Sequence, residues 1–221
     1  MDPLIDKLGT NEFIKLAIEN SYFFSVDIVK KRQEELQNSL NTELPARKTT
    51  KKDSCASDYA QEEKNEKLYY CEQNNGVEIQ IEVDKDGNSK VRSLINSYVG
   101  YWAGNGKENS NFVNYTISHI WGRAFDPRYF TSLWNIVLVP SWANTLMDKV
   151  PTNGSIESKL QSTIKKICSE LYKDVDKGMG EYKPKMDFNE NDVVKGTYQI
   201  NVLQEKIGKQ RQEPQTKEIK I

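Results

Sequence analysis

Histidine and cysteine are both scarce in this chain of 221 residues. The one histidine is His119, and the three cysteines are Cys55, Cys71 and Cys168. The odd number and wide spacing of the cysteines, with no CxxC pair, argue against a zinc ribbon and against a disulfide scaffold. Any imidazole chemistry must therefore come from His119.

Long apolar runs, a signal-peptide pattern and a strong net charge are also absent. No apolar run approaches about 18 residues, so we expect no membrane span and no membrane partner. The opening residues, MDPLIDKLG, lack the basic-then-apolar pattern of a signal peptide, and we expect a cytoplasmic protein. The formal net charge of -1 gives no global basic field, although a local basic surface could still bind DNA.

What the chain does contain is a mixture of helical and strand-like patterns, which predicts an α+β fold. With 37% hydrophobic and 29% charged residues it is polar for a globular protein, yet long enough to bury a core. We divide it into five segments: an N-terminal helical segment at 1–40, a polar linker at 41–67, a strand-turn-helix segment at 68–110 that is a candidate recognition or assembly module, a ββα unit with a following helix at 111–175, and a C-terminal strand with a charged tail at 176–221.

The N-terminal part predicts two helices and then a loop. Apolar residues recur at roughly helical intervals over 11–40, with Asn11 as a plausible first N-cap and Ser25 or Asp27 beginning the second helix. Residues 41–67 contain few large apolar side chains, which predicts a linker or long loop. A basic cluster in this loop could contact phosphates or simply be solvated: Arg47, Lys48, Lys51 and Lys52.

Two further stretches outside the centre have clear patterns. Residues 77–83 alternate strictly, which predicts a half-buried strand, and the Asp86-Gly87 turn leads into a predicted helix. Residues 155–173 predict an amphipathic helix with Ser155 at its start. A strand-like piece, VVKGTYQINVL, precedes a charged tail that we expect to be frayed.

The central segment opens with a strand that ends on the histidine. Apolar residues alternate over 113–117 and lead into His119. Gly122 then breaks the element, and residues 123–132 predict a loop. A histidine at such a strand end could act as a general base toward a water molecule.

A second strand and a short helix follow this loop. Residues 134–139 are apolar with Asn135 near their start, and Pro140 closes the strand and is tolerated in the first turn of a helix. The run SWANTLMDK predicts a helix on which Asn144 and Asp148 share one face, because they are four residues apart. Their oxygen atoms could hold a hard divalent cation near the same water, and such a cation stabilises the charge that develops during phosphodiester cleavage.

Three polar residues of the central segment have a characteristic order and spacing. His119 in ISHI, Asn135 in WNIVLVP and Asn144 in WANTLMDK are separated by 16 positions (119 to 135) and 9 positions (135 to 144). On these residues, the segment at 113–149 resembles the HNH endonucleases of the ββα-metal class, in the H-N-N variant. The resemblance implies that His119 activates water, Asn135 holds the loop in place by hydrogen bonds, and Asn144 ligates Mg²⁺ or Mn²⁺. It also implies a central ββα-metal nuclease-like unit flanked by helices, acting on DNA in a restriction or defence role.

One position departs from the family pattern. The residue directly before the general base is usually an aspartate or histidine that ligates the metal, but here it is Ser118, a poorer ligand for a magnesium-like ion. Ser118 could still contribute, Asp148 or Asp126 could supply the missing acid, or the site could be degenerate. The cysteine pairs of zinc-stapled HNH domains are absent too, so apolar packing must hold the unit together.

Two arginines beside the loop are candidates for phosphate contact. Arg123 and Arg128 suit phosphate recognition, but either could instead pair with Asp126 or lie in solvent. The sequence thus favours a metal-dependent DNA endonuclease, which would need a homodimer to cut both strands. Two other classes stay open: a nucleic-acid-binding protein with a degenerate site, and an interaction protein with no enzymatic activity.

Overall fold

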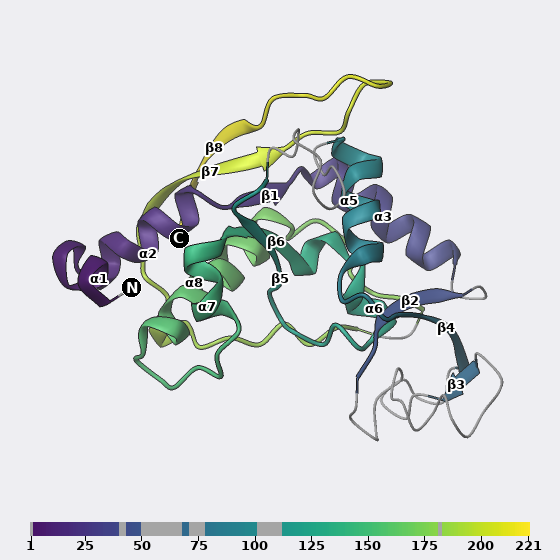
Figure 1. Ribbon diagram of the computed structural model, residues 1–221, viewed down its shortest axis with the longest axis horizontal. Coiled ribbons are helices and arrows are strands. Elements are labelled where there is room, and N and C mark those ends of the chain that lie inside the picture. Colours follow the sequence, from purple (N-terminus) through teal and green to yellow (C-terminus); the bar gives the residue numbers. More distant parts are fainter. Residues whose placement is uncertain (1, 40–42, 50–67, 71–77, 101–111, 181–182) are drawn as a thin grey trace.

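The computed structural model describes residues 2–39, 43–49, 68–70, 78–100, 112–180 and 183–221. Its elements, in chain order, are α1 (Asp2–Leu8), α2 (Thr10–Glu19), β1 (Tyr22–Phe24), α3 (Val26–Asn38), β2 (Leu44–Arg47), β3 (Leu68–Tyr70), β4 (Glu78–Asp84), α5 (Ser89–Val99), β5 (Tyr115–His119), α6 (Pro127–Phe130), η2 (Leu133–Asn135), β6 (Ile136–Pro140), α7 (Ser141–Met147), α8 (Ile156–Leu171), η3 (Glu190–Asp192), β7 (Thr197–Leu203) and β8 (Gln215–Lys220). Helices and strands are interspersed along the chain, so the protein is a mixed α+β fold, as the sequence predicts (Figure 1).

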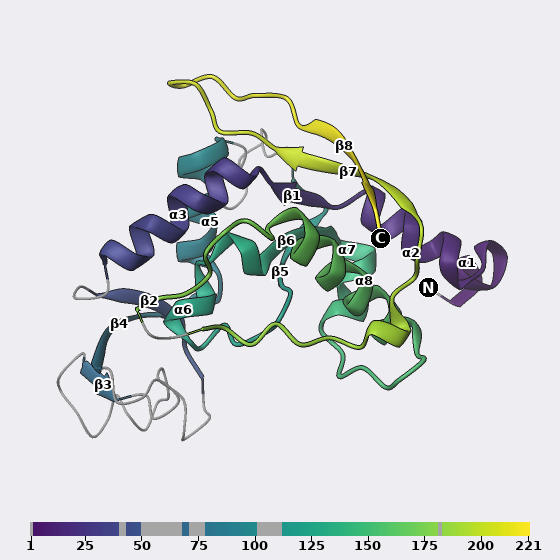
Figure 2. The same ribbon diagram turned by 180° about the vertical axis from the view of Figure 1, so that it is seen from behind.

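Five strands from distant parts of the chain form the main sheet, in the order β5-β6-β1-β7-β8. β1 is the middle strand and pairs antiparallel with β6 and parallel with β7, so that Tyr22 lies opposite both Leu138 and Asn201. β5 and β6 are antiparallel, and so are β7 and β8. N-terminal, central and C-terminal parts of the chain therefore share one sheet, and Figures 1 and 2 show β7 and β8 together along one side of the molecule.

One large hydrophobic core joins this sheet to helices from both halves of the chain. α8 contributes Leu160, Ile164 and Ile167, all fully buried, so the predicted amphipathic helix is confirmed. Ser155 caps this helix by accepting a hydrogen bond from Ser158 N at 3.2 Å. Removal of these apolar side chains from water is the main contribution that holds the helices on the sheet.

A second sheet of three strands, in the order β2-β4-β3, lies at the opposite end of the molecule from α1 (Figure 1). β2 runs parallel to β4, with Arg47 opposite Asp84, and β3 runs antiparallel to β4. The predicted strand, turn and helix are observed here as β4, a turn and α5. Gly87 has φ +82°, a value that this turn needs and that favours glycine.

Four segments form strands that the sequence did not predict, among them residues 68–70, which form β3. Residues 44–47 were expected in a loop but form β2, and residues 22–24 were expected within a helical stretch but form β1. The tail that was expected to be frayed contains β8, which pairs with β7 over six residues. These predictions were wrong because pairing with distant strands, and not local periodicity, decides the conformation of short segments.

Of the two helix starts predicted in the N-terminal part, one is confirmed. α3 begins at Val26, and Ser25 caps it by accepting from Ile28 N at 3.5 Å. α2 begins at Thr10 with Gly9 as its N-cap residue, so the prediction that Asn11 is the cap was wrong. Among the helices in the described ranges, none is long and apolar enough to cross a membrane.

Candidate functional site

β5, β6 and α7 form a strand-strand-helix unit in the middle of the chain, with α6 and η2 between its two strands. β5 ends at His119, which lies opposite Ile136 of β6, and β6 ends at Pro140 directly before α7. Ser141 N donates to Asn114 O at 2.8 Å, which ties the start of the helix to the residue preceding β5. The two strands and the helix predicted around His119 are therefore present with shorter bounds. Val113 lies before β5 and is exposed, and Trp134 and Asn135 belong to η2 and not to the second strand.

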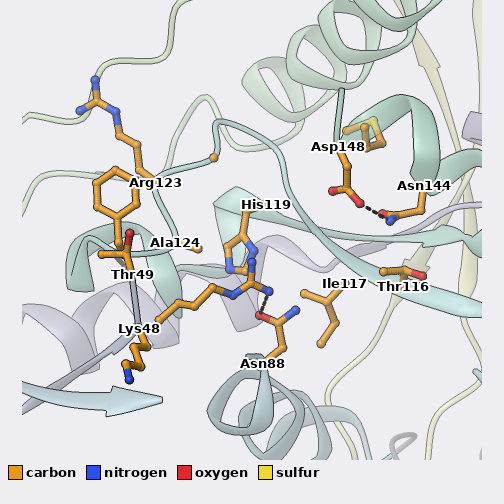
Figure 3. A pocket seen from close by; sticks show the side chains of 14 residues that line it. Lys48, Thr49, Asn88, Thr116, Ile117, His119, Arg123, Ala124, Asn144 and Asp148 are labelled. Atoms are coloured by element: carbon orange, nitrogen blue, oxygen red, sulfur yellow. Dashed lines mark hydrogen bonds between the residues drawn. The ribbon is translucent and has the colours of Figure 1, made fainter. Parts of the chain in front are cut away.

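A cavity of about 430 Å³ lies beside this unit. Among the described residues, the ionisable side chains that line it are Arg47, Lys48, His119, Arg123 and Asp148. Figure 3 shows His119 in the middle of the lining residues, with Asn144 and Asp148 to one side and Arg123 and Lys48 to the other. Cationic groups outnumber carboxylates by three to one among these described lining residues, in a chain of net charge -1, and this excess favours an anionic ligand.

His119 is held as a neutral imidazole with a defined proton position. Its Nε2 lies 2.9 Å from Phe130 O, and because a carbonyl oxygen can only accept, Nε2 carries the proton. The ring also stacks on Phe130, with centroids 5.6 Å apart. Burial lowers the pKa of His119 to about 4; the hydrogen bond to Phe130 opposes this shift and the charge of Arg47 adds to it. The lone pair of the neutral ring therefore lies on Nδ1, where a base needs it.

We expect the titration midpoint of His119 near pH 4, below its ordinary value of 6.5. Activity that depends on the neutral ring should then fall only as the pH drops through about 4. Between 6.5 and 4 the unfolded chain binds this proton and the folded protein does not, so His119 lowers the free energy of unfolding as the pH falls through that window. NMR of untagged protein follows this one imidazole directly, and a midpoint at or above 6.5 contradicts the prediction.

Asn135 is fully buried and fastens the loop that follows β5 by three side-chain hydrogen bonds. Its Oδ1 accepts from Trp121 N at 2.8 Å, and its Nδ2 donates to Gly122 O at 3.2 Å and to Tyr129 O at 3.1 Å. Its backbone oxygen accepts from Ile120 N at 2.8 Å. These contacts are of the kind that the HNH resemblance implies. Asn135 is not among the described lining residues of the cavity. Its predicted part in catalysis is therefore to hold the loop after β5 in position, and this role stays a prediction.

Asn144 and Asp148 meet at the end of α7, and both line the cavity. Asn144 Nδ2 donates to Asp148 Oδ2 at 2.7 Å, while Asn144 Oδ1 is buried without a hydrogen-bond partner among the described residues. A buried oxygen with no partner, next to a carboxylate, can serve a cation or a donor from a ligand. No three His, Cys, Asp or Glu side chains cluster at metal-binding distance in the part of the chain that the structure describes.

Three residues that the sequence placed in or near the site, Ser118, Asp126 and Arg128, are not among the described residues that line the cavity. Ser118 is buried in β5 and is not among the lining residues. Asp126 and Arg128 form an ion pair in the interior, in which Arg128 Nε donates to Asp126 Oδ1 at 2.6 Å. Two buried charges are tolerated because they are paired and hydrogen-bonded. The metal-ligand roles of Ser118 and Asp126 stay predictions, and of the alternatives open for Arg128 the structure shows the pairing with Asp126.

Of the two arginines predicted to contact phosphate, Arg123 lines the cavity and Arg128 does not. It is the one non-glycine residue with positive φ in the described ranges, at +55°, a conformation that ordinary residues rarely adopt. Its guanidinium carbon lies 5.4 Å from the ring centre of Tyr129. Residues 127–130 of the loop predicted to follow it form the single-turn helix α6, which is too short for periodicity to reveal.

The second sheet brings to the cavity two side chains that the sequence did not connect with His119. Arg47 was expected in a basic loop cluster, of which Lys51 and Lys52 lie outside the described residues, and Asn88 carried no signal beyond its turn. Arg47 Nη2 donates to Asn88 Oδ1 at 2.9 Å, the bond dashed beside Asn88 in Figure 3. No local pattern links these positions, because their meeting depends on the pairing of β2 with β4.

The fold and the site define a mixed α+β protein with a histidine-containing, locally cationic cavity beside a strand-strand-helix unit. The chain belongs to the family described as Uncharacterised protein PM1201, whose model matches residues 24–220. The uncharacterized protein PM1201 of Pasteurella multocida (strain Pm70) is 28% identical over 95 residues, which make up 43% of this chain and 40% of that protein. The similarity thus spans less than half of this curated relative. No solved structure matches the chain.

Proposed function

We propose that this protein is a metal-dependent endonuclease that hydrolyses phosphodiester bonds in DNA. The observation that carries the proposal is the neutral imidazole of His119, with its lone pair on Nδ1, in a cavity that also holds a carboxylate and three cationic side chains. The placement of His119 at a strand end and of Asn144 on the following helix supports an HNH-type ββα-metal unit.

His119 would act as the general base. Nδ1 takes a proton from a water molecule as the water oxygen forms a bond to phosphorus, and the bond from phosphorus to the leaving oxygen breaks. The leaving oxygen takes a proton from solvent. The imidazolium then returns its own proton to solvent, because the buried site and the nearby Arg47 charge favour the neutral ring.

Asp148 and Asn144 are the residues that would hold the divalent cation, Mg²⁺ or Mn²⁺. Both offer hard oxygen atoms, and Asn144 Oδ1 has no other partner among the described residues. Mg²⁺ is commonly held by one or two carboxylates, with water and substrate phosphates completing its coordination, so one carboxylate and one amide oxygen fit. When bound, such an ion stabilises the negative charge that builds up on the phosphate.

Replacing Asp148 with asparagine is expected to raise the Mg²⁺ concentration for half-maximal cleavage by at least about tenfold, because a neutral amide is a weaker ligand than a carboxylate. Initial rates across a Mg²⁺ series measure this. Asp174→Asn removes an exposed carboxylate outside the cavity and is the matched control. The same Mg²⁺ dependence in Asp148→Asn and the wild type would remove Asp148 from the site.

The test of the proposed function is plasmid nicking by folded wild-type protein with Mg²⁺, then Mn²⁺, beside a sample with chelator. Metal-dependent conversion of supercoiled to open-circular DNA supports the proposal, and its absence with every divalent metal tested refutes it. A single centre cuts one strand, so linear DNA as a first product would indicate a homodimer, which sedimentation would show. Methylation-sensitive cutting would be consistent with a restriction or defence role.

A nucleic-acid-binding protein with a degenerate site is the second candidate. Ser118 favours it, because the position that usually carries a metal ligand holds a buried hydroxyl away from the cavity. Such a protein would bind DNA in a salt-sensitive manner without cutting it. An interaction protein would do neither, so binding and nicking assays together separate the three classes.

A further inference from the structure

We propose that Arg47 is a substrate-binding residue of the cavity and contacts a phosphodiester of the nucleic-acid strand. The inference rests on the proposed function and deepens it. The site is built on the main sheet, and Arg47 is a residue that the second sheet supplies to it, at the end of β2.

The guanidinium of Arg47 is oriented by two hydrogen bonds to neutral acceptors. Nε donates to Gly87 O at 3.1 Å and Nη2 donates to Asn88 Oδ1 at 2.9 Å. A guanidinium has five N–H donors, so these two bonds leave others for a ligand. The backbone N of Arg47 donates to Ala124 O at 2.9 Å, which joins the end of β2 to the loop that follows β5. A guanidinium oriented in advance loses little freedom on making a two-point contact with phosphate.

If Arg47 had only a structural role, the nearby carboxylate of Asp84 would be expected to form an ion pair with it, but that carboxylate binds other groups. Asp84 lies opposite Arg47 in the strand pairing. Its carboxylate instead accepts from Asp86 N at 3.1 Å, Ser89 Oγ at 2.8 Å and Lys90 N at 2.8 Å, and so holds the start of α5. Arg47 forms no ion pair with any carboxylate in the described ranges, so a half-buried positive charge beside the cavity is left for an anion from solution to neutralise.

The other groups around the cavity favour an anion with repeated charges. Lys48 and Arg123 line the same cavity, and Asp148 is the one acidic side chain among its described lining residues. A nucleic-acid strand carries one negative charge per phosphate and presents two oxygen acceptors at each, which suits arginines at neighbouring positions. With a cation at Asp148, the cavity would carry no unneutralised negative group to repel such a strand.

The test measures DNA binding without divalent metal, so that it does not depend on cleavage. A fluorescent DNA duplex is titrated with untagged full-length protein at several salt concentrations, and the imidazole resonance of His119 reports occupancy of the cavity. We expect Arg47→Gln to weaken binding about tenfold and to reduce the salt dependence by the equivalent of about one phosphate contact. Arg92→Gln, on α5 outside the cavity, makes the same charge change and should bind as the wild type does.

Arg47→Lys keeps the charge but loses the fork of donors, so it should bind several-fold more weakly with an unchanged salt dependence. This variant decides the matter if thermal unfolding shows that Arg47→Gln does not fold. Equal affinity and salt dependence in the wild type and the Arg47 variants would overturn the proposal. Wild-type binding that leaves the His119 resonance unchanged would also overturn it, and so would the absence of wild-type binding. The nuclease proposal fails on a different result: no cleavage by wild-type protein that binds DNA.

Discussion

Replacing His119 with alanine is expected to lower the rate of metal-dependent plasmid nicking by about 10²- to 10⁴-fold, the usual contribution of a positioned general base. The chain has no second imidazole to replace it. Asp148, the carboxylate among the described lining residues, is assigned to the cation and would not be free to take the proton. Initial nicking rates at neutral pH, with saturating Mg²⁺, measure the effect.

His119→Gln separates loss of the base from loss of structure. Glutamine can still donate to Phe130 O, the one hydrogen-bond partner of the His119 side chain among the described residues, but it has no basic nitrogen. Both variants should therefore unfold near the wild-type temperature and both should be inactive. A nicking rate equal to that of the wild type in either variant would show that His119 is not the base.

Replacing Asn135 with alanine is expected to lower the free energy of unfolding by roughly 3–5 kcal/mol, a large effect for a single substitution. The change leaves three backbone groups without their partner: Tyr129 O in a buried hydrogen bond, and Trp121 N and Gly122 O in partly buried ones. Each buried polar group left unsatisfied costs about 1–3 kcal/mol. Urea unfolding followed by tryptophan fluorescence measures the loss, since Trp121 and Trp134 flank this loop.

Asn144→Ala is the matched control for this prediction. Its side chain makes one exposed hydrogen bond, to Asp148, and asparagine is a poor helix former, so alanine should change the unfolding free energy by less than about 0.5 kcal/mol. Asn135→Asp should resemble Asn135→Ala, because a carboxylate cannot donate to Gly122 O and Tyr129 O. An Asn135→Ala protein as stable as Asn144→Ala would mean that the loop is held by other contacts.

Local patterns were sufficient for the elements that frame the site. The alternation that leads into His119, the apolar run closed by Pro140 and the stripe of the helix capped by Ser155 each extend over consecutive residues. Their positions follow from periodicity and from chain-breaking residues, which act within a few positions along the chain. Short strands such as β1, β2 and β8 carry no such pattern, and only their partners define them.

The sequence by itself determined which chemistry is available to this protein: one imidazole at the end of a strand, with an asparagine 16 positions on (119 to 135) and another on the following helix. Only the tertiary structure decided which charges accompany it. Strand pairing brings Arg47 to the cavity, and the interior pairing with Asp126 withdraws Arg128 from it. The first outcome depends on contacts between elements far apart in the chain and has no signal in local sequence. The second was one of the alternatives that the sequence left open, and burial of the Asp126–Arg128 pair decided it.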